Sequence, residues 1–169
     1  VEFAYRDFGP PGKLVRDEPV ADLDVRLAQF GNGVRLNFKA TDFVVDQVEV
    51  RLRVGEGRLA LPRDQPGLDL LASVAQPIGG LGRHTAAELG SALTGHSVGV
   101  GFQVESDACV FAARCSRREL TLCLQLLAAN LTDSALREET RRQADAYIGS
   151  MFASLAASPG GPITMLASR

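Results

Sequence analysis

Histidine and cysteine are scarce in this sequence of 169 residues, which contains two histidines and three cysteines. His84 and His96 are twelve residues apart, which matches no zinc motif, and neither has a cysteine or an acidic cluster beside it. His84 directly precedes Thr85, a predicted helix cap, so we expect an exposed or cap-adjacent histidine. A cysteine–histidine nucleophile stays open from spacing alone, but no local pattern supports one.

The cysteines show no metal-binding spacing either. Cys109 and Cys115 fall in one segment that is expected to be extended, which separates their Cα atoms by about 20 Å at about 3.3 Å per residue. That distance is too long for a disulfide. Cys123 falls on the apolar side of a predicted helix. We interpret all three as small core residues.

Runs of one charge and long apolar runs are also missing. The eighteen Lys and Arg residues are interspersed with twenty Asp and Glu residues, and the net charge is −2. This pattern gives no reason to expect nucleic acid or an anionic membrane as a partner. The apolar runs are too short to span a bilayer. The apolar fraction of 46% is typical of one globular domain with its own core.

Residues 1–22 are rich in proline, glycine and charge, and we predict a linker or an N-terminal arm there. Phe3, Tyr5 and Phe8 are the side chains that would anchor this arm to a neighbouring surface. The N-terminus lacks a methionine and lacks a basic patch followed by an apolar segment. We therefore expect a piece of a longer polypeptide that does not begin with a signal peptide.

Alternating apolar residues predict strands from Asp24 onward. Residues 24–30 and 34–39 flank a Gly-Asn-Gly turn, and Asn-Gly is a strong hairpin signal because both residues accept positive φ. Residues 48–54 alternate most clearly, with valine and leucine on one side and Glu49, Arg51 and Arg53 on the other. Residues 98–104 and 108–115 predict two further strands joined by a polar turn.

Four helices are expected between and after these strands. An apolar helix follows Pro66 and is predicted to end at Pro77, and a glycine-rich bend follows it. Thr85 to Glu88 and Ser116 to Glu119 each have the sequence of a capping box that opens a helix. A long helix is expected from about Ser134 to Ala157, with Arg137, Arg141 and Arg142 on its solvent side, and residues 158–162 end it.

The glycines of the bend, at positions 79, 80 and 82, do not spell a dinucleotide-binding motif or a phosphate-binding loop. They also follow a helix, whereas those motifs follow a strand. A tight connection between two helices explains them better. With strands and helices in this order, the sequence predicts an α+β domain over residues 23–169, with a mostly antiparallel sheet and helices packed on one face.

Several segments, taken in order, resemble one domain of the insulinase/pitrilysin family of zinc metallopeptidases, which includes the mitochondrial processing peptidase. They are residues 29–36 (QFGNGVRL), the strand ending at Gly55, and residues 66–71 (PGLDLL), 79–82 (GGLG), 85–93 and 124–139. The resemblance runs from about Asp24 to the C-terminus. It implies that the family domain continues beyond Arg169, so that its last strands would be missing from this fragment.

Active domains of that family carry the motif H-x-x-E-H on the helix after the third strand, where two histidines hold zinc and the glutamate activates water. The resemblance places Leu70 at the first histidine, Ser73 at the glutamate and Val74 at the second histidine. The third ligand of the family, a glutamate on the long later helix, falls near Tyr147. Leucine and valine have no lone pair for zinc, and serine does not replace a carboxylate as a base. We expect no catalytic residue and no metal or other cofactor in this domain.

The resemblance therefore implies a non-catalytic domain, which helps to enclose and bind a peptide for a separate catalytic H-x-x-E-H domain. The parent protein would be a bacterial zinc metalloendopeptidase, with zinc in its catalytic domain. The expected partners are that catalytic domain, in the same polypeptide or an adjacent subunit, and the peptide substrate, with no nucleic acid and no membrane. In the family, peptides often add as a strand to the edge of a sheet.

Two alternatives are kept. One is a structural assembly subunit with no proteolytic role, and the other, ranked last, is an independent enzyme that uses His84 or a cysteine. By resemblance, a periplasmic location is favoured for a bacterial parent, and a cytoplasmic one is the alternative.

Overall fold

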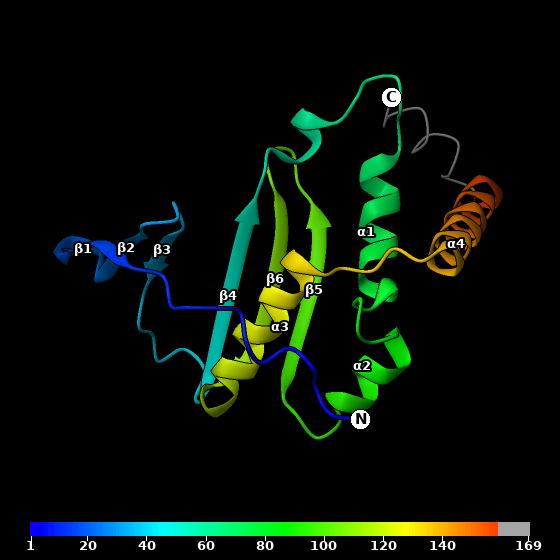
Figure 1. Ribbon diagram of the computed structural model, residues 1–169. Helices are drawn as coiled ribbons and strands as arrows, with labels where there is room; N and C mark the ends of the chain where they lie inside the picture. The colour runs from blue at the N-terminus through cyan, green and yellow to red at the C-terminus, as the bar shows by residue number, and fades with distance from the viewer. Residues whose placement is uncertain (159–169) are drawn as a thin grey trace. The chain divides into compact units, whose positions relative to one another are not determined.

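The computed structural model describes residues 1–158, which form two compact units (Figure 1). Unit 1 contains residues 1–6 and the chain from residue 48 on, and unit 2 contains residues 7–47. The strands are β1 (Leu14–Val20), β2 (Val25–Phe30), β3 (Arg35–Phe38), β4 (Gln47–Val54), β5 (Val98–Val104) and β6 (Cys109–Ser116). The helices are α1 (Leu68–Gly79), α2 (Ala86–Ala92), α3 (Leu120–Thr132) and α4 (Glu138–Ala157), with short 3-10 helices at Ala21–Leu23, Gly57–Ala60 and Arg117–Glu119.

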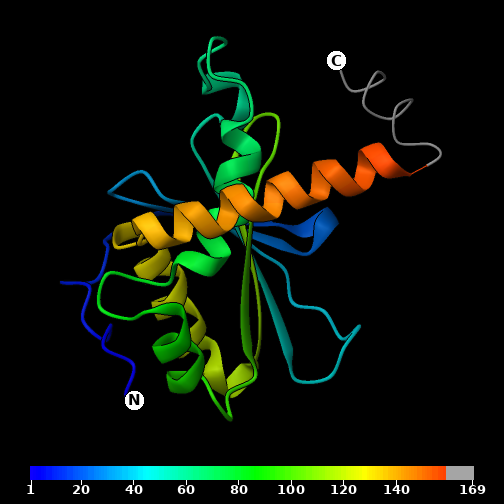
Figure 2. The same ribbon diagram turned by 90° about the vertical axis from the view of Figure 1, so that its right-hand side faces the viewer.

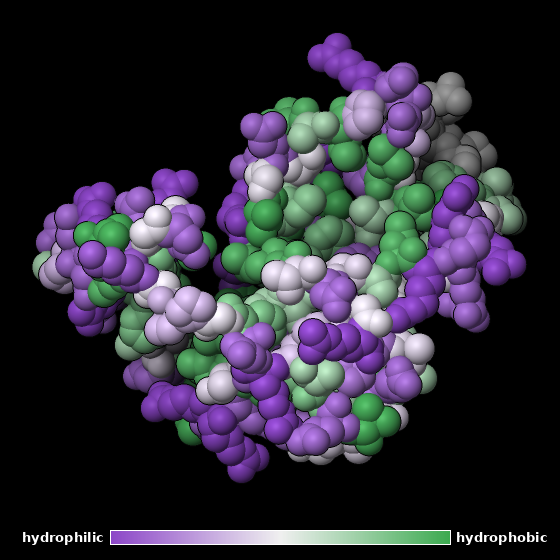
Figure 3. Space-filling model, in the orientation of Figure 1, coloured by the Kyte–Doolittle hydropathy of each residue, from purple (hydrophilic) through white to green (hydrophobic). Residues whose placement is uncertain are grey.

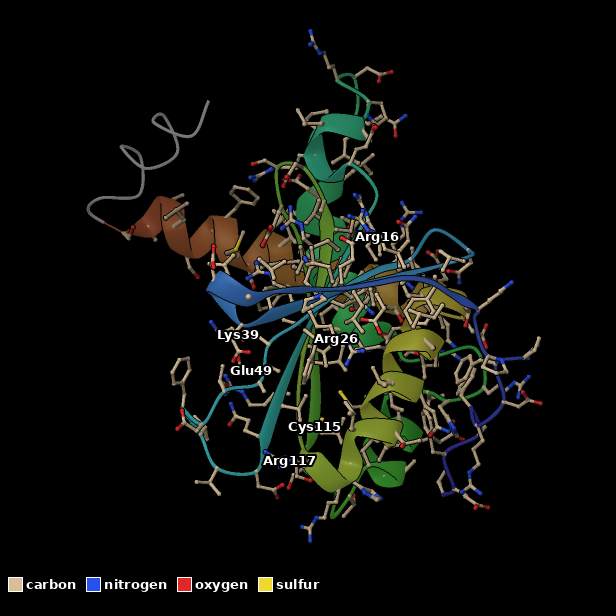
Figure 4. All side chains as sticks on the ribbon, turned by 90° about the vertical axis from the view of Figure 1, so that its left-hand side faces the viewer. Arg16, Arg26, Lys39, Glu49, Cys115 and Arg117 are labelled. Atoms are coloured by element: carbon tan, nitrogen blue, oxygen red, sulfur yellow. The ribbon has the colours of Figure 1, made fainter. Side chains whose placement is uncertain are left out.

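Unit 2 is a three-stranded antiparallel sheet in the order β1-β2-β3. The predicted hairpin is confirmed as β2 and β3. Its turn has positive φ at Gly33 alone, and the Asn32 side chain accepts a hydrogen bond from the Val34 N–H. Within residues 7–47 no side chain is buried. Figure 4 shows Arg16, Arg26 and Lys39 on this sheet.

The prediction of a linker over residues 1–22 is wrong for Leu14–Val20, which form β1. This strand has no apolar alternation of its own. It forms because its backbone pairs with β2, in register from Arg16 opposite Gln29 to Val20 opposite Val25. As an edge strand it tolerates Pro19, because one row of its N–H groups needs no partner strand.

Unit 1 is built on a second three-stranded sheet in the order β4-β6-β5. Strands β5 and β6 pair antiparallel from Val98 opposite Cys115 to Val104 opposite Cys109. As predicted, Val48, Val50 and Leu52 of β4 pack on the core, and its charged residues lie on the other face, but Val54 is exposed. There Arg51 and Arg53 pair with Glu105, and Arg114 of β6 pairs with Glu49. The predicted α+β fold is confirmed, although the strands form two sheets where we expected one.

Helix α3 packs on β5 and β6, and α1 packs against β5 and α4 (Figures 1 and 2). The core below α3 contains Phe111, Ala113, Cys115, Cys123 and Leu127. Figure 4 shows Cys115 on β6, beside α3. Cys123 is fully buried, as expected for a small core residue. Within residues 1–158, no helix combines the length and the apolar character that a membrane span requires.

Three predicted helix boundaries are wrong. Pro77 lies inside α1, which continues to Gly79, because a proline in the last turn removes one backbone hydrogen bond without stopping the next residues. Helix α4 begins at Glu138, not near Ser134. The capping box at Thr85 and Glu88 is formed, but the one at Ser116 and Glu119 is not. A 3-10 turn replaces the second box, and the residues predicted to follow Ser158 as a helix stop lie outside the described part of the chain.

Candidate functional site

The middle of α1 is where the resemblance places the catalytic motif. Leu70, Ser73 and Val74 share one helical face by their spacing, and all three are half-buried. The Ser73 hydroxyl accepts a hydrogen bond from the backbone N–H of Val104 at the end of β5, with 3.3 Å between Oγ and N. Ser73 therefore ties α1 to the edge of the sheet.

Tyr147, the residue expected near the third ligand position, lies on α4. This helix packs on α1, and its buried residues are Thr140 and Ala144. Tyr147 itself is 60% exposed. The structure thus brings α1 and α4 together and leaves the Tyr147 side chain largely in solvent.

The donor atoms at these positions do not fit zinc. Leu70 and Val74 carry only carbon, and the Ser73 hydroxyl already has a partner in the backbone. Within residues 1–158, no three side chains among His, Cys, Asp and Glu form a group able to hold a metal ion. The α1 face can pack and accept a hydrogen bond, and we derive no metal-dependent step from it.

Strand β5, beside α1, forms one edge of the main sheet in the described part of the chain. Because N–H groups alternate in direction along a strand, those of Val100 and Phe102 point to the same edge as that of Val104. The faces at Gly99 and Gly101 are open, since side chains added there would meet no atom closer than 3.9 Å. Figure 3 shows apolar side chains gathered between the upper part of this sheet and α1. The edge therefore offers outward N–H groups before Val104, and the sheet face beside them is open at Gly99 and Gly101.

The glycine-rich bend is a packed connection between α1 and α2. The Arg137 guanidinium donates hydrogen bonds to the backbone carbonyls of Gly79, Leu81 and Gly82, at 2.8 to 3.3 Å. A Cβ atom at Gly82 would lie 2.4 Å from the Asp133 carboxylate, and one at Gly79 would lie 2.1 Å from the Ala135 carbonyl oxygen. The glycines are therefore needed for close approach, as a tight helix connection requires.

The prediction that Arg137 lies on the solvent side of the last helix is wrong, because Arg137 precedes α4 and binds the bend. A signal for this contact is present in the sequence. The end of a helix leaves carbonyl groups that need donors, and a glycine-rich bend offers no side chain to supply them. The sequence alone does not reveal which arginine does so.

The two histidines have different surroundings. His84 lies beside the cap residue Thr85 as expected, but it is buried and not exposed, because the N-terminal residues Phe3 and Tyr5 cover it. Its Nε2 atom accepts a hydrogen bond from the Ala4 N–H at 3.0 Å. His96 is exposed and lies 3.0 Å from the Glu119 carboxylate, through Nδ1. Phe3 and Tyr5 thus anchor the arm as predicted, whereas Phe8 is 44% exposed.

Glu119 binds three groups at the start of α3. Its carboxylate accepts hydrogen bonds from the Ser116 hydroxyl and the Ser97 N–H, in addition to its contact with His96. The Ser116 hydroxyl, followed by His96, lowers the pKa of the Glu119 carboxyl group. These bonds use the carboxylate that the expected capping box would need, which explains why the box does not form.

Cys115 and Cys123 lie together in the core, a proximity that their sequence spacing did not reveal. Burial, followed by a hydrogen bond with Cys115, raises the pKa of the Cys123 thiol to about 12. A thiol of this kind is a poor nucleophile because the thiolate is the reactive form. The two histidines bond to other groups, His84 to the Ala4 N–H and His96 to the Glu119 carboxylate.

Unit 2 has a depression of about 490 Å³ beside β1 and β2. Its lining includes Asp17, Arg26 and Phe38. The Arg26 guanidinium binds both oxygens of the Asp17 carboxylate, so the two charges there compensate each other. Asp24 adds a second carboxylate to the lining.

Comparisons with known proteins place this geometry in context. A scan against models of protein families finds no match, and a search of curated proteins finds none either. Solved structures do match. The ferredoxin protease FusC, solved as a mutant in complex with Arabidopsis ferredoxin, aligns over 97% of this chain with a TM-score of 0.78 and 15% identity. The periplasmic protease PqqL from Escherichia coli aligns over 88% with a TM-score of 0.73 and 17% identity.

A third structure, a peptidase M16 inactive domain from Pseudomonas fluorescens, aligns over 84% of the chain with a TM-score of 0.67 and 15% identity. The chain has the fold of a peptidase M16 domain. It spans only 18%, 16% and 34% of the three matched chains, in the same order. The peptidase M16 fold agrees with the insulinase-type fold expected from the sequence.

Proposed function

We propose that this chain is a non-catalytic domain of a zinc metallopeptidase, which helps to enclose and bind a peptide for a separate H-x-x-E-H domain. The observation that carries the proposal is the middle of α1 in a peptidase M16 fold, where Leu70 and Val74 have no donor atoms and Ser73 bonds the sheet. The fold likeness to an M16 inactive domain supports it. Zinc belongs to the catalytic domain of the parent protein.

The peptide is held at the edge of β5. An extended peptide that pairs with a strand edge needs outward backbone groups, which β5 offers before Val104, and the sheet face beside them is open at Gly99 and Gly101. The Ser73 hydroxyl occupies the N–H of Val104, so pairing starts before that residue, at Phe102 and Val100. The likeness to PqqL, described as a periplasmic protease, favours a periplasmic parent.

The first experiment combines the protein with the H-x-x-E-H domain encoded in the same or an adjacent reading frame. We expect the two to associate at micromolar concentration, and the mixture to hydrolyse peptides faster than the catalytic domain alone. Sedimentation and a fluorogenic peptide assay measure the two effects. Absence of association at that concentration contradicts the proposal, and association without a gain in hydrolysis favours the structural assembly subunit.

The second experiment tests the β5 edge in that mixture. Val100→Pro removes one outward N–H and keeps an apolar side chain, so the sheet is retained while peptide pairing weakens. The control is Val54→Pro at the end of β4. We expect the first change to raise the KM for peptide at least about tenfold, a loss comparable to 1.4 kcal/mol, with little effect from the control. Equal KM values for the two variants would argue against this edge.

A further inference from the structure

The N-terminal residues of the chain are bound to unit 1 in the way that a peptide ligand is bound. In residues 2–6, Phe3 and Tyr5 are 7% and 6% exposed, while Glu2, Ala4 and Arg6 between and around them are exposed. The residues they contact are distant in the sequence, on the bend after α1 and on α3. The segment has no regular secondary structure, and Figures 1 and 2 show it passing beside α2 and α3.

The backbone of this segment is recognised directly. The Ala4 N–H donates to His84 Nε2 at 3.0 Å, and the Ala4 carbonyl lies 3.5 Å from the Arg83 guanidinium. The carbonyl of Arg6 accepts a hydrogen bond from the Gln125 side chain at 3.4 Å. Such contacts hold an extended main chain whatever its sequence.

The side chains supply the selectivity. The Phe3 ring stacks on His84 with 5.9 Å between centroids and 17° between planes, and it packs with Leu81, Leu126 and Ala129. The first position therefore favours a flat apolar side chain.

Tyr5 is recognised by its hydroxyl group as well as by its ring. The hydroxyl donates to the Asp133 carboxylate at 2.5 Å and accepts from the Arg83 N–H at 2.8 Å. The Arg83 guanidinium lies 5.3 Å from the ring centroid, within reach of a cation–π interaction. Burial, and then the Asp133 carboxylate, raises the pKa of Tyr5, so the phenol stays protonated as a donor. A phenylalanine here would leave Asp133 and the Arg83 N–H without this partner.

We propose that Leu81, Arg83, His84, Leu126 and Asp133, which we name the anchor site, form a second peptide-binding site for an extended Phe-x-Tyr sequence. The chain's own residues 3–5 occupy it as an intramolecular ligand. The residues of the site come from the bend after α1, from α3 and from the loop after α3, and Arg137 holds the bend in place. Val98 and Val100 of β5 pack against the same apolar cluster, but the hydrogen bonds to the segment come from the bend, α3 and the loop after α3. The inference does not rest on the proposed function.

The tether explains why the site is occupied by this segment. Residues 7–13 connect it to β1, are exposed, and contain Pro10, Pro11 and Gly12. The covalent path from this segment to the rest of unit 1 runs through residues 7–47, so the segment is an intramolecular ligand with an effective concentration of at most about the millimolar range. Weakening the tethered ligand removes its competition with a free peptide.

The test uses the whole chain and a fluorescently labelled peptide with the sequence of residues 1–6. In the Phe3→Ala/Tyr5→Ala variant we expect the peptide to bind, with an apparent Kd at least about tenfold lower than for the unchanged chain, because the tethered competitor is gone. A control peptide with alanine at both aromatic positions should not bind. A peptide with phenylalanine in place of the tyrosine should bind about tenfold more weakly.

Adding Asp133→Asn to the double variant separates the two recognition elements. It should lower the affinity for the tyrosine peptide, which donates to this carboxylate, and leave the affinity for the phenylalanine peptide unchanged or higher, because that peptide leaves the charge unpaired. Equal changes in affinity for both peptides would show that Asp133 does not distinguish tyrosine from phenylalanine.

The outcomes that overturn the proposal are distinct. A folded double variant that binds no peptide up to about 1 mM, the scale of the intramolecular effective concentration, shows that the anchor site does not bind a separate peptide. A double variant that does not fold also contradicts it, because residues 3–5 would then be part of the core. In the unchanged chain, an excess of the peptide should accelerate hydrogen exchange at Ala4, and unchanged exchange contradicts displacement. None of these measurements needs a catalytic domain.

Discussion

The bend after α1 and the middle of α1 are adjacent in the sequence, but their side chains have different roles. The bend is held by polar contacts from Arg137, Asp133 and Tyr5, and glycines allow the close approach. The middle of α1 has one polar contact, from Ser73 to the backbone of β5. The comparison teaches that this fold depends on the bend and its partners, and that it needs no metal ligand on α1.

The largest effect is expected at Leu81, which is fully buried in the bend. Leu81→Ala should lower the free energy of unfolding by about 2–5 kcal/mol, because it leaves a cavity in the core. The matched control is Leu136→Ala, since Leu136 is 64% exposed. Urea denaturation measures the free energy of unfolding of both variants. Equal losses would show that the bend contributes no more to stability than an exposed position.

Arg137→Ala is expected to rank second. It removes the charged donor from three backbone carbonyls of the bend, with a loss of about 2–3 kcal/mol. Arg142→Ala, at an exposed position of α4, should change stability by less than about 0.5 kcal/mol. If Arg142→Ala lowers the free energy of unfolding as much as Arg137→Ala does, the Arg137 guanidinium does not hold the bend.

Tyr5→Phe should have an intermediate effect of about 1–2 kcal/mol, because it leaves the Asp133 carboxylate and the Arg83 N–H without the phenol. Tyr147→Phe is the control, since Tyr147 is 60% exposed. Thermal unfolding compares the two variants, and Tyr5→Phe should have the lower Tm. A lower Tm for Tyr147→Phe would contradict the prediction.

Ser73→Ala tests the middle of α1. It removes a single bond to the Val104 N–H, so we expect a loss of no more than about 1 kcal/mol. The measurement is again urea denaturation. A loss as large as that of Arg137→Ala would mean that the middle of α1 contributes to the fold as much as the bend does.

The smallest effect concerns Cys123, whose thiol pKa is raised by burial from the ordinary value of 9.0 to about 12. A thiol with a raised pKa is stable in its neutral form, so this contribution to stability is complete below about pH 9 and is lost as the pH rises through the folded value. At pH 8 we expect Cys123 to react with iodoacetamide only after denaturation. Alkylation of the folded protein at the rate of a free thiol, followed by mass spectrometry, would contradict its burial.

Local signals predicted the parts of the fold that depend on neighbouring residues. The Asn-Gly turn between β2 and β3 and the capping box at Thr85 are of this kind, since each is formed within a few residues. Strand β1 was missed because its charged residues and Pro19 give no strand pattern, and its pairing with β2 decides its structure. The Ser116 box failed because Ser97 and His96, distant in sequence, bind Glu119.

The candidate site divides in the same way. The residue types at Leu70 and Val74 exclude zinc ligands at those two positions from the sequence alone, because neither side chain has a donor atom. The anchor site could be predicted only in part, through the aromatic residues Phe3 and Tyr5. Its receptor side requires residues from the bend, α3 and the following loop to meet in space, and no local pattern encodes that meeting.

The most direct test of the central claim is the zinc content of the purified protein, measured by elemental analysis after dialysis against zinc. The account predicts well below one equivalent per chain, because the α1 face offers carbon atoms and one hydroxyl already bonded to Val104. One tightly bound equivalent per chain, lost on mutation of residues in this domain, would contradict it.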